Sequence, residues 1–199
     1  RQHTLARKLN FVSFTPSTSF NLKSATGLQD ERALLYWLLE GEWGLRDTHA
    51  AEVFQCGVND AQAWRRRLEA RLYGGEPVNI EPKLQRLFID GLRSQEQDGA
   101  PEYGLRERFM RLCAAFGTGE PDDADLHERN LVIGDLRARL AETCLKALEP
   151  DLVILDEFQR FKDLLSQNTD AGALADELFS YSAGDEQVRT LLLSATPYK

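Results

Sequence analysis

The middle of the chain shows the residue pattern of helices. Between about residues 27 and 149, the order of apolar and polar positions predicts an almost wholly helical region. Its first helix carries a dense apolar group and is expected to be well buried: Ala33, Leu34, Tyr36, Trp37, Leu38 and Leu39. Asn59 is a candidate N-cap for a second helix, which is expected to run through Tyr73 and to stop at Gly74-Gly75.

Prolines and one polar stretch indicate where the remaining helices begin and end. Pro82 and Pro101 stand near the starts of two helices, where a missing backbone N–H costs little. Residues 117–125 are polar and predict a loop. A last helix is expected over about residues 126–148, and it ends before Pro150.

Three short apolar runs predict strands. Residues 10–14 alternate, as in a half-buried strand, whereas residues 152–155 and 190–193 are continuous apolar runs, typical of strands buried on both faces. A helical stretch around residues 170–182 separates the last two runs. A succession of strand, helix and strand with apolar strands predicts a parallel sheet covered by helices.

The predicted fold class is therefore α/β, with a partial parallel sheet and a large all-helical insertion. Residues 1–26 supply a strand and a Ser/Thr-rich turn, residues 27–149 form the insertion, and residues 150–199 supply the two apolar strands. The chain begins with Arg1 and its one methionine is Met110, so we expect a piece of a longer protein.

Composition and charge exclude several classes of protein. An apolar content of 42% and a charged content of 28% are typical of a soluble globular domain. No run approaches the roughly 20 apolar residues of a membrane span, and no secretory start is visible, so we expect no membrane association and a cytoplasmic location. The net charge of −8 argues against nucleic-acid binding by bulk charge, although it allows a local basic groove. Cys56, Cys113 and Cys144 are too far apart for a C-x-x-C pair, which disfavours disulfides and a zinc site.

Polar residues follow the last two predicted strands directly. Asp156-Glu157 comes after one strand and Ser194-Ala195-Thr196 after the other. Ligands of open α/β sheets bind at the carboxyl edge, where these residues are expected. A nucleotide hydrolase needs a carboxylate for the Mg²⁺ shell and a second group that orients the attacking water. Asp156 would hold Mg²⁺ through water, and Glu157 would act as general base.

Position in the chain, rather than composition, distinguishes these two groups. Asp-Glu also occurs at residues 30–31, 176–177 and 185–186, and Ser-Ala-Thr also occurs at residues 24–26. Only Asp156-Glu157 and Ser194-Ala195-Thr196 follow an uninterrupted apolar run, and they do so on consecutive predicted strands.

Three segments resemble motifs of superfamily 2 helicases. Residues 151–159 resemble motif II, residues 190–197 resemble the Ser-Ala-Thr motif III, and residues 14–20 are similar to an earlier Thr-Pro-type motif that touches the nucleic-acid backbone. The Asp-Glu-Phe-Gln spelling, followed by Arg160-Phe161, is closer to bacterial Swi/Snf-like and defence-associated helicases than to the DEAD-box group. The resemblance implies a fragment of the first RecA-like motor domain and covers about a third of the chain, leaving the helical region without a match.

The resemblance also implies roles for individual residues. Asp156, as the metal ligand, and Glu157 would serve ATP hydrolysis, and Gln159 would contact the γ-phosphate region or link to motif III. The resemblance implies that the nucleotide state is coupled to nucleic-acid binding by Ser194, Ala195 and Thr196. Phosphates of the nucleic acid, with DNA as the favoured substrate, would be contacted by Thr15, Ser17 and Thr18.

The chain departs from the helicase pattern in two respects. A motor of this kind cradles the phosphates with a Gly-Lys-Ser/Thr P-loop, and none of the 14 glycines precedes a lysine. ATP and Mg²⁺ are therefore expected as cofactors of an intact, longer enzyme, and this chain alone is expected to be inactive. The second motor domain, with its arginine finger, is likewise expected outside this piece of the longer protein.

Simpler interpretations stand beside each of these assignments. Asp156-Glu157 could be a solvated strand end, Ser194-Ala195-Thr196 a helix cap or turn, and residues 15–19 an ordinary turn. The basic run Arg65-Arg66-Arg67 with Arg71 could bind nucleic acid, but a solvated helix face paired with Glu69 is favoured.

The helical region supports a second hypothesis about function. It could dock a partner protein, as a non-catalytic interaction module on a helicase remnant that has lost its ATPase. Three tryptophans are expected in the core or an interface rather than as base-stacking platforms: Trp37, Trp43 and Trp64. Cys113 is expected to be a buried apolar residue.

Overall fold

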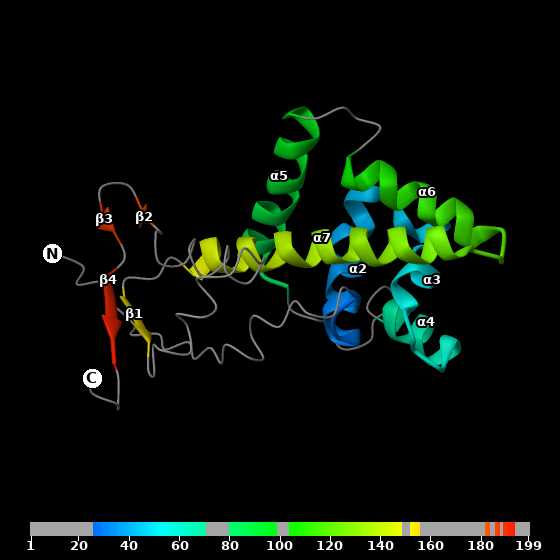
Figure 1. Cartoon of the computed structure of the whole chain (residues 1–199), viewed down its shortest axis with the longest axis horizontal. Helices are drawn as coiled ribbons and strands as arrows, with labels where there is room; N and C mark the ends of the chain where they lie inside the picture. Colours follow the sequence, from blue (N-terminus) through cyan, green and yellow to red (C-terminus); the bar gives the residue numbers. More distant parts are fainter. Residues whose placement is uncertain are drawn as a thin grey trace, which may run out of the picture.

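The chain is mostly helical and carries a small two-stranded parallel sheet (Figure 1). The structure is a computed structural model that describes residues 26–70, 80–98, 104–148, 152–155, 182–183, 186–187 and 189–193. The described helices follow one another from residue 29 to residue 148: α2 (Gln29–Trp43), the short 3-10 helix η1 (Leu45–Asp47), α3 (Ala50–Gln55), α4 (Ala61–Ala70), α5 (Pro82–Asp98), α6 (Leu105–Gly117) and α7 (Asp123–Leu148). The strands lie beyond the carboxyl end of α7 (Figure 1).

Helix α2 forms the centre of the helical domain, which we define as residues 26–148. Most of its apolar side chains are buried, as the dense apolar group predicted, although Leu34 is only partly buried. The surrounding helices each bury one stripe at helical spacing, such as Phe109, Leu112 and Cys113 on α6. On α7 the buried stripe consists of Val132, Ile133, Leu136 and Leu140. These stripes meet in one continuous core, so the described helices α2 to α7 pack as a unit.

Three aromatic contacts tie α2, α3 and α6 together in this core. The ring centroids of Phe54 and Phe109 lie 5.0 Å apart, and those of Trp43 and Phe109 lie 5.5 Å apart. Tyr36 meets Phe54 edge to face at 6.4 Å. Aromatic pairs in such arrangements stabilise the fold beyond what the burial of their surface area contributes.

Helix α4 begins one residue later than an Asn59 cap would require. The Ala63 N–H donates to Asp60 Oδ1 at 2.8 Å, so Asp60 caps the helix and the prediction for Asn59 was wrong. Both residue types cap well, and the sequence alone did not distinguish them. Tyr73 and Gly74-Gly75 lie outside the described residues.

Helix α7 begins at Asp123, three residues before the predicted start at residue 126. Asp122 and Asp125 cap it reciprocally: the Asp125 N–H donates to Asp122 Oδ1 at 2.8 Å, and the Asp122 N–H donates to Asp125 Oδ2 at 3.1 Å. The acidic stretch that predicted a loop is therefore partly the first turn of a helix. The end of α7 at Leu148 and the start of α5 at Pro82 agree with the predictions, while Pro101 lies outside the described residues.

The two apolar runs near the end of the sequence form a parallel pair of strands, as predicted. Strand β1 (Leu152–Leu155) pairs with β4 (Arg189–Leu192), with Leu152 opposite Arg189 and Leu155 opposite Leu192. Between them in sequence, β2 (Ser182–Ala183) and β3 (Glu186–Gln187) pair antiparallel. Ser182, the last residue of the helix predicted around residues 170–182, therefore belongs to a strand. Residues 170–181 lie outside the described part.

The apolar side chains of β1 and β4 are more exposed than predicted. On β1, Leu152 is 52% exposed and Ile154 51%, and on β4 Leu191 is 45% exposed, so these strands are not buried on both faces. Leu193, directly after β4, is 42% exposed. Ile154 lies opposite Leu191 and hence on the same face of the sheet. None of the helices in the described part of the chain combines the length and apolarity that crossing a membrane requires.

Candidate functional site

The parallel strands β1 and β4 precede the two residue groups that the sequence singled out. Leu155 and Leu192 are paired, so the two strands reach their carboxyl ends at nearly the same level of the sheet. In sequence, Asp156 follows Leu155 directly, and Ser194 follows Leu193. The predicted site residues themselves lie outside the described part of the chain: Thr15, Ser17, Thr18, Asp156, Glu157, Gln159, Ser194, Ala195 and Thr196.

A second copy of the Asp-Glu pair, Asp30-Glu31, is described and has a structural role. It lies in the first turn of α2, where acidic residues favour the helix dipole. The Glu31 carboxylate accepts the Leu28 N–H at 2.9 Å, as the N3 residue of a capping box does. Asp30 pairs with Arg67 at 2.6 Å. This copy is therefore explained by capping and ion pairing.

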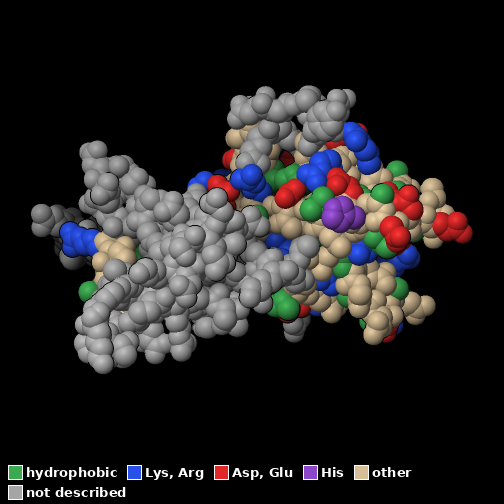
Figure 2. All heavy atoms as spheres, in the orientation of Figure 1, with side chains coloured by type: hydrophobic (Ala, Val, Ile, Leu, Met, Phe, Trp, Pro, Cys, Tyr) green, Lys and Arg blue, Asp and Glu red, His purple; other side chains and the backbone are tan. Residues whose placement is uncertain are grey.

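Two arginines of the basic run on α4 form ion pairs with other helices of the domain. Arg65 pairs with Glu52 on α3, and Arg67 pairs with Asp30 on α2. Neither arginine pairs with Glu69, the partner expected from the sequence, and Arg71 lies outside the described residues. Figure 2 shows basic and acidic side chains interspersed over the visible face of the helical domain, without a single basic patch. These contacts favour the solvated helix face over a nucleic-acid patch.

The three tryptophans belong to the core, as expected. Trp64 is fully buried, and its Nε1–H donates to the Ala51 carbonyl at 2.7 Å. Trp37 donates in the same way to the Leu68 carbonyl at 3.1 Å, and Trp43 is 5% exposed. Rings buried in this way are not available for stacking on bases.

The three cysteines are free thiols of low reactivity. Burial raises the pKa of Cys113 to about 11, and it also raises the pKa of Cys56 and Cys144. Because the thiolate is the reactive form, these thiols are poor nucleophiles and metal ligands at neutral pH. The described residues hold no group of three His, Cys, Asp or Glu side chains that could bind a metal ion.

Sequence reasoning missed a buried arginine on α2. Arg32 is 4% exposed, and burial lowers its pKa. Its guanidinium uses all five N–H groups on backbone carbonyls: Thr26 (3.2 Å), Gly27 (2.8 Å), Phe54 (2.8 Å), Gln55 (3.3 Å) and Cys56 (3.1 Å). The last three lie at the carboxyl end of α3, where carbonyls lack helical partners. The one available signal was the position of this charged residue directly before a dense apolar group.

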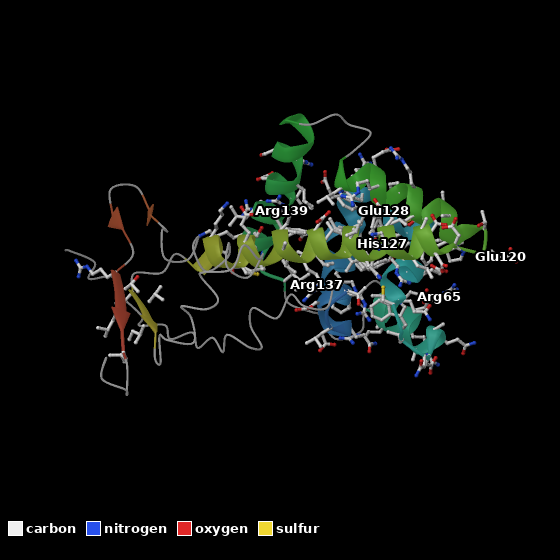
Figure 3. All side chains as sticks on the ribbon, in the orientation of Figure 1. Arg65, Glu120, His127, Glu128, Arg137 and Arg139 are labelled. Atoms are coloured by element: carbon white, nitrogen blue, oxygen red, sulfur yellow. The ribbon has the colours of Figure 1, made fainter. Side chains whose placement is uncertain are left out.

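A second arginine, Arg137, joins α7 to the start of α2. Its side chain is 5% exposed, and its Nε donates to Glu31 Oε2 at 2.9 Å. Figure 3 shows Arg137 on the side of α7 toward α2. Gly27 lies against this pair with φ of +61°, and a Cβ at this position would approach Arg137 Nε and Glu31 Oε2 to 2.1 Å. Gly27 is therefore required both for its left-handed backbone and for close packing.

Comparison with known proteins adds no relative: no family model, no curated protein and no solved structure matches the chain.

Proposed function

We propose that the chain forms part of the first motor domain of a superfamily 2 helicase or translocase, which couples ATP hydrolysis to movement on nucleic acid, with DNA as the substrate. The observation that carries the proposal is the parallel pairing of β1 with β4. These two strands precede the Asp-Glu and Ser-Ala-Thr groups, and adjacent parallel strands bring the residues that follow them to one edge of a sheet.

The residue types at this edge suit nucleotide hydrolysis. Asp156 offers the carboxylate oxygen that Mg²⁺ prefers, and Glu157 offers a base for the attacking water. When bound, Mg²⁺ would neutralise charge that develops on the transferred phosphate. Gln159 and the Ser194-Ala195-Thr196 group would connect the nucleotide to the nucleic-acid contact. Since the sequence has no Gly-Lys pair, the P-loop would come from another part of the motor.

The beginning of the sequence has the charge of a phosphate-binding segment. Residues 1–29 hold four basic residues and no Asp or Glu, a charge of +4 in a chain whose net charge is −8: Arg1, Arg7, Lys8 and Lys23. Thr15, Ser17 and Thr18 lie among them and supply hydroxyl groups. Basic and hydroxyl side chains together are the usual phosphate contacts, which position a protein without reading sequence.

A second candidate function is suggested by the helical domain. Its core is continuous across α2 to α7, so it forms a packed surface of its own on which a partner protein could dock. In that case the parent protein would lack a functional P-loop and would not hydrolyse ATP.

The proposed function predicts a specific effect of Glu157→Gln on the longer protein that supplies the P-loop. The variant should bind ATP as the wild type does, because the amide keeps the shape of the side chain. DNA-stimulated hydrolysis should fall by roughly 100-fold or more, since general-base catalysis contributes about that factor. Steady-state ATPase assays and nucleotide-binding titrations measure the two effects.

Glu177→Gln is the matched control, because Glu177 belongs to another Asp-Glu pair that does not follow an apolar run. It should leave hydrolysis unchanged. Equal turnover in wild type and Glu157→Gln would refute the assignment, and a wild type without ATPase would favour the interaction module.

A further inference from the structure

Two separate contacts hold residues 26–28, through which the chain passes into the helical domain. Arg32 binds the carbonyls of Thr26 and Gly27 and joins them to the carboxyl end of α3. Glu31 accepts the N–H of Leu28 and is itself paired with Arg137 on α7. Three consecutive residues are thus fixed against two different helices.

Helix α7 continues beyond this point and is the described element that precedes β1 in sequence. From Arg137 it runs a further 11 residues to Leu148, or about 17 Å at 1.5 Å per residue. Strand β1 begins four residues later, at Leu152. In sequence, the helix that holds residues 26–28 is therefore followed by the strand that precedes the Asp-Glu box.

We propose that Arg32 and Arg137, with Glu31, form a rigid joint that fixes the path of residues 26–28 relative to α7. Its consequence for activity rests on the proposed function. The segment before the joint carries Thr15, Ser17 and Thr18, and β1 precedes Asp156-Glu157. The helical domain is then the mechanical link between the nucleic-acid contact and the ATPase box, rather than an appended module.

The joint itself is tested in the 199-residue chain by ¹⁵N relaxation of the Thr26, Gly27 and Leu28 amides. In the wild type their order parameters should equal those of α2, about 0.85. Arg32→Lys keeps the charge but has three donors in place of five. In this variant and in Arg137→Gln, the order parameters of residues 26–28 should fall below about 0.6, while those of α2 stay high.

Arg108→Gln is the matched control. Arg108 also joins two helices through carboxylates, at 2.7 Å to Glu128 and 2.9 Å to Asp135, but it ties α6 to α7 away from residues 26–28. It should leave the order of residues 26–28 unchanged. The joint is overturned by unchanged order in Arg137→Gln, or by an equal loss in Arg108→Gln. Gly27→Ala, which displaces the same ion pair, decides the question where Arg32→Lys does not fold.

A second measurement separates the joint from the proposed function. In the longer motor, Arg137→Gln should lower the stimulation of ATP hydrolysis by DNA by roughly 2- to 30-fold and leave basal hydrolysis unchanged, whereas Arg108→Gln should keep full stimulation. Full stimulation in Arg137→Gln, with residues 26–28 loosened, would overturn the link. A wild type without ATPase would refute the proposed function, while the relaxation data would still decide whether the joint exists.

Discussion

Single polar side chains are buried in the helical domain where backbone carbonyls can accept their hydrogen bonds. Arg32 has five such acceptors, and Trp37 and Trp64 each have one. A buried donor without an acceptor costs about 1–3 kcal/mol, and a charged one costs more. These residues are therefore fixed parts of the core, and their chemistry is not available to a ligand.

At the residue scale, Cys113 predicts a loss of stability at alkaline pH. A thiol in the unfolded chain has a pKa near 8.5, whereas burial raises the pKa of Cys113 to about 11. Below about pH 8.5 both states keep the proton. As pH rises from there to about 11, the unfolded state loses the proton while the folded state retains it, so stability falls.

The comparison of wild type with Cys113→Ala isolates this effect. Between pH 8 and pH 11 the stability of the wild type relative to the variant should fall by about 2–3 kcal/mol, as measured by urea unfolding. A difference that does not change with pH would show that Cys113 is not shielded from solvent.

At the scale of elements, the helices could be predicted better than their ends. Apolar spacing is a local property, and it predicted a buried α2 and an α7 that ends at Leu148. The caps depend on which of several suitable side chains reaches a free N–H. Asp60 rather than Asn59 caps α4, and the Asp122–Asp125 pair starts α7 inside an apparent loop.

Two exposed glycines inside helices are positions where alanine should stabilise the domain. Gly41 in α2 and Gly91 in α5 are exposed, and a Cβ at either position would meet no atom within 4 Å. Gly41→Ala and Gly91→Ala should each stabilise the domain by about 0.5–1 kcal/mol, because alanine restricts the unfolded chain and favours the helix. Thermal and urea unfolding measure the change.

Gly44 provides the contrasting substitution. It ends α2 with φ of +66°, and its N–H donates to the Glu40 carbonyl. Gly44→Ala should destabilise the domain by roughly 1 kcal/mol, since a side chain disfavours the left-handed conformation. A stabilising Gly44→Ala would contradict this account of the helix end.

At the scale of the whole molecule, long-range contacts set the limit of prediction. The parallel pairing of β1 with β4 could be predicted, because continuous apolar runs separated by a connection favour it. The exposure of Ile154 and Leu191 could not, because burial depends on what packs against a strand. The joint formed by Arg32 and Arg137 could not be predicted either. The acceptors of Arg32 lie up to 24 residues away in sequence, and the acceptor of Arg137 lies 106 residues away.

The central claim is that the Asp-Glu and Ser-Ala-Thr groups share one edge of the sheet, and a crosslink in the 199-residue chain tests it directly. If the register of Leu155 with Leu192 continued beyond the described strands, Glu157 would stand opposite Ser194. Neighbouring strands lie about 5 Å apart, which suits a disulfide. With the three native cysteines replaced by alanine, the pair Glu157→Cys and Ser194→Cys should form an intrachain crosslink rapidly, detected by peptide mass spectrometry. The control pair, Glu177→Cys with Ser194→Cys, should not. A crosslink that forms no faster in the first pair than in the control would contradict the shared edge, and with it the helicase assignment.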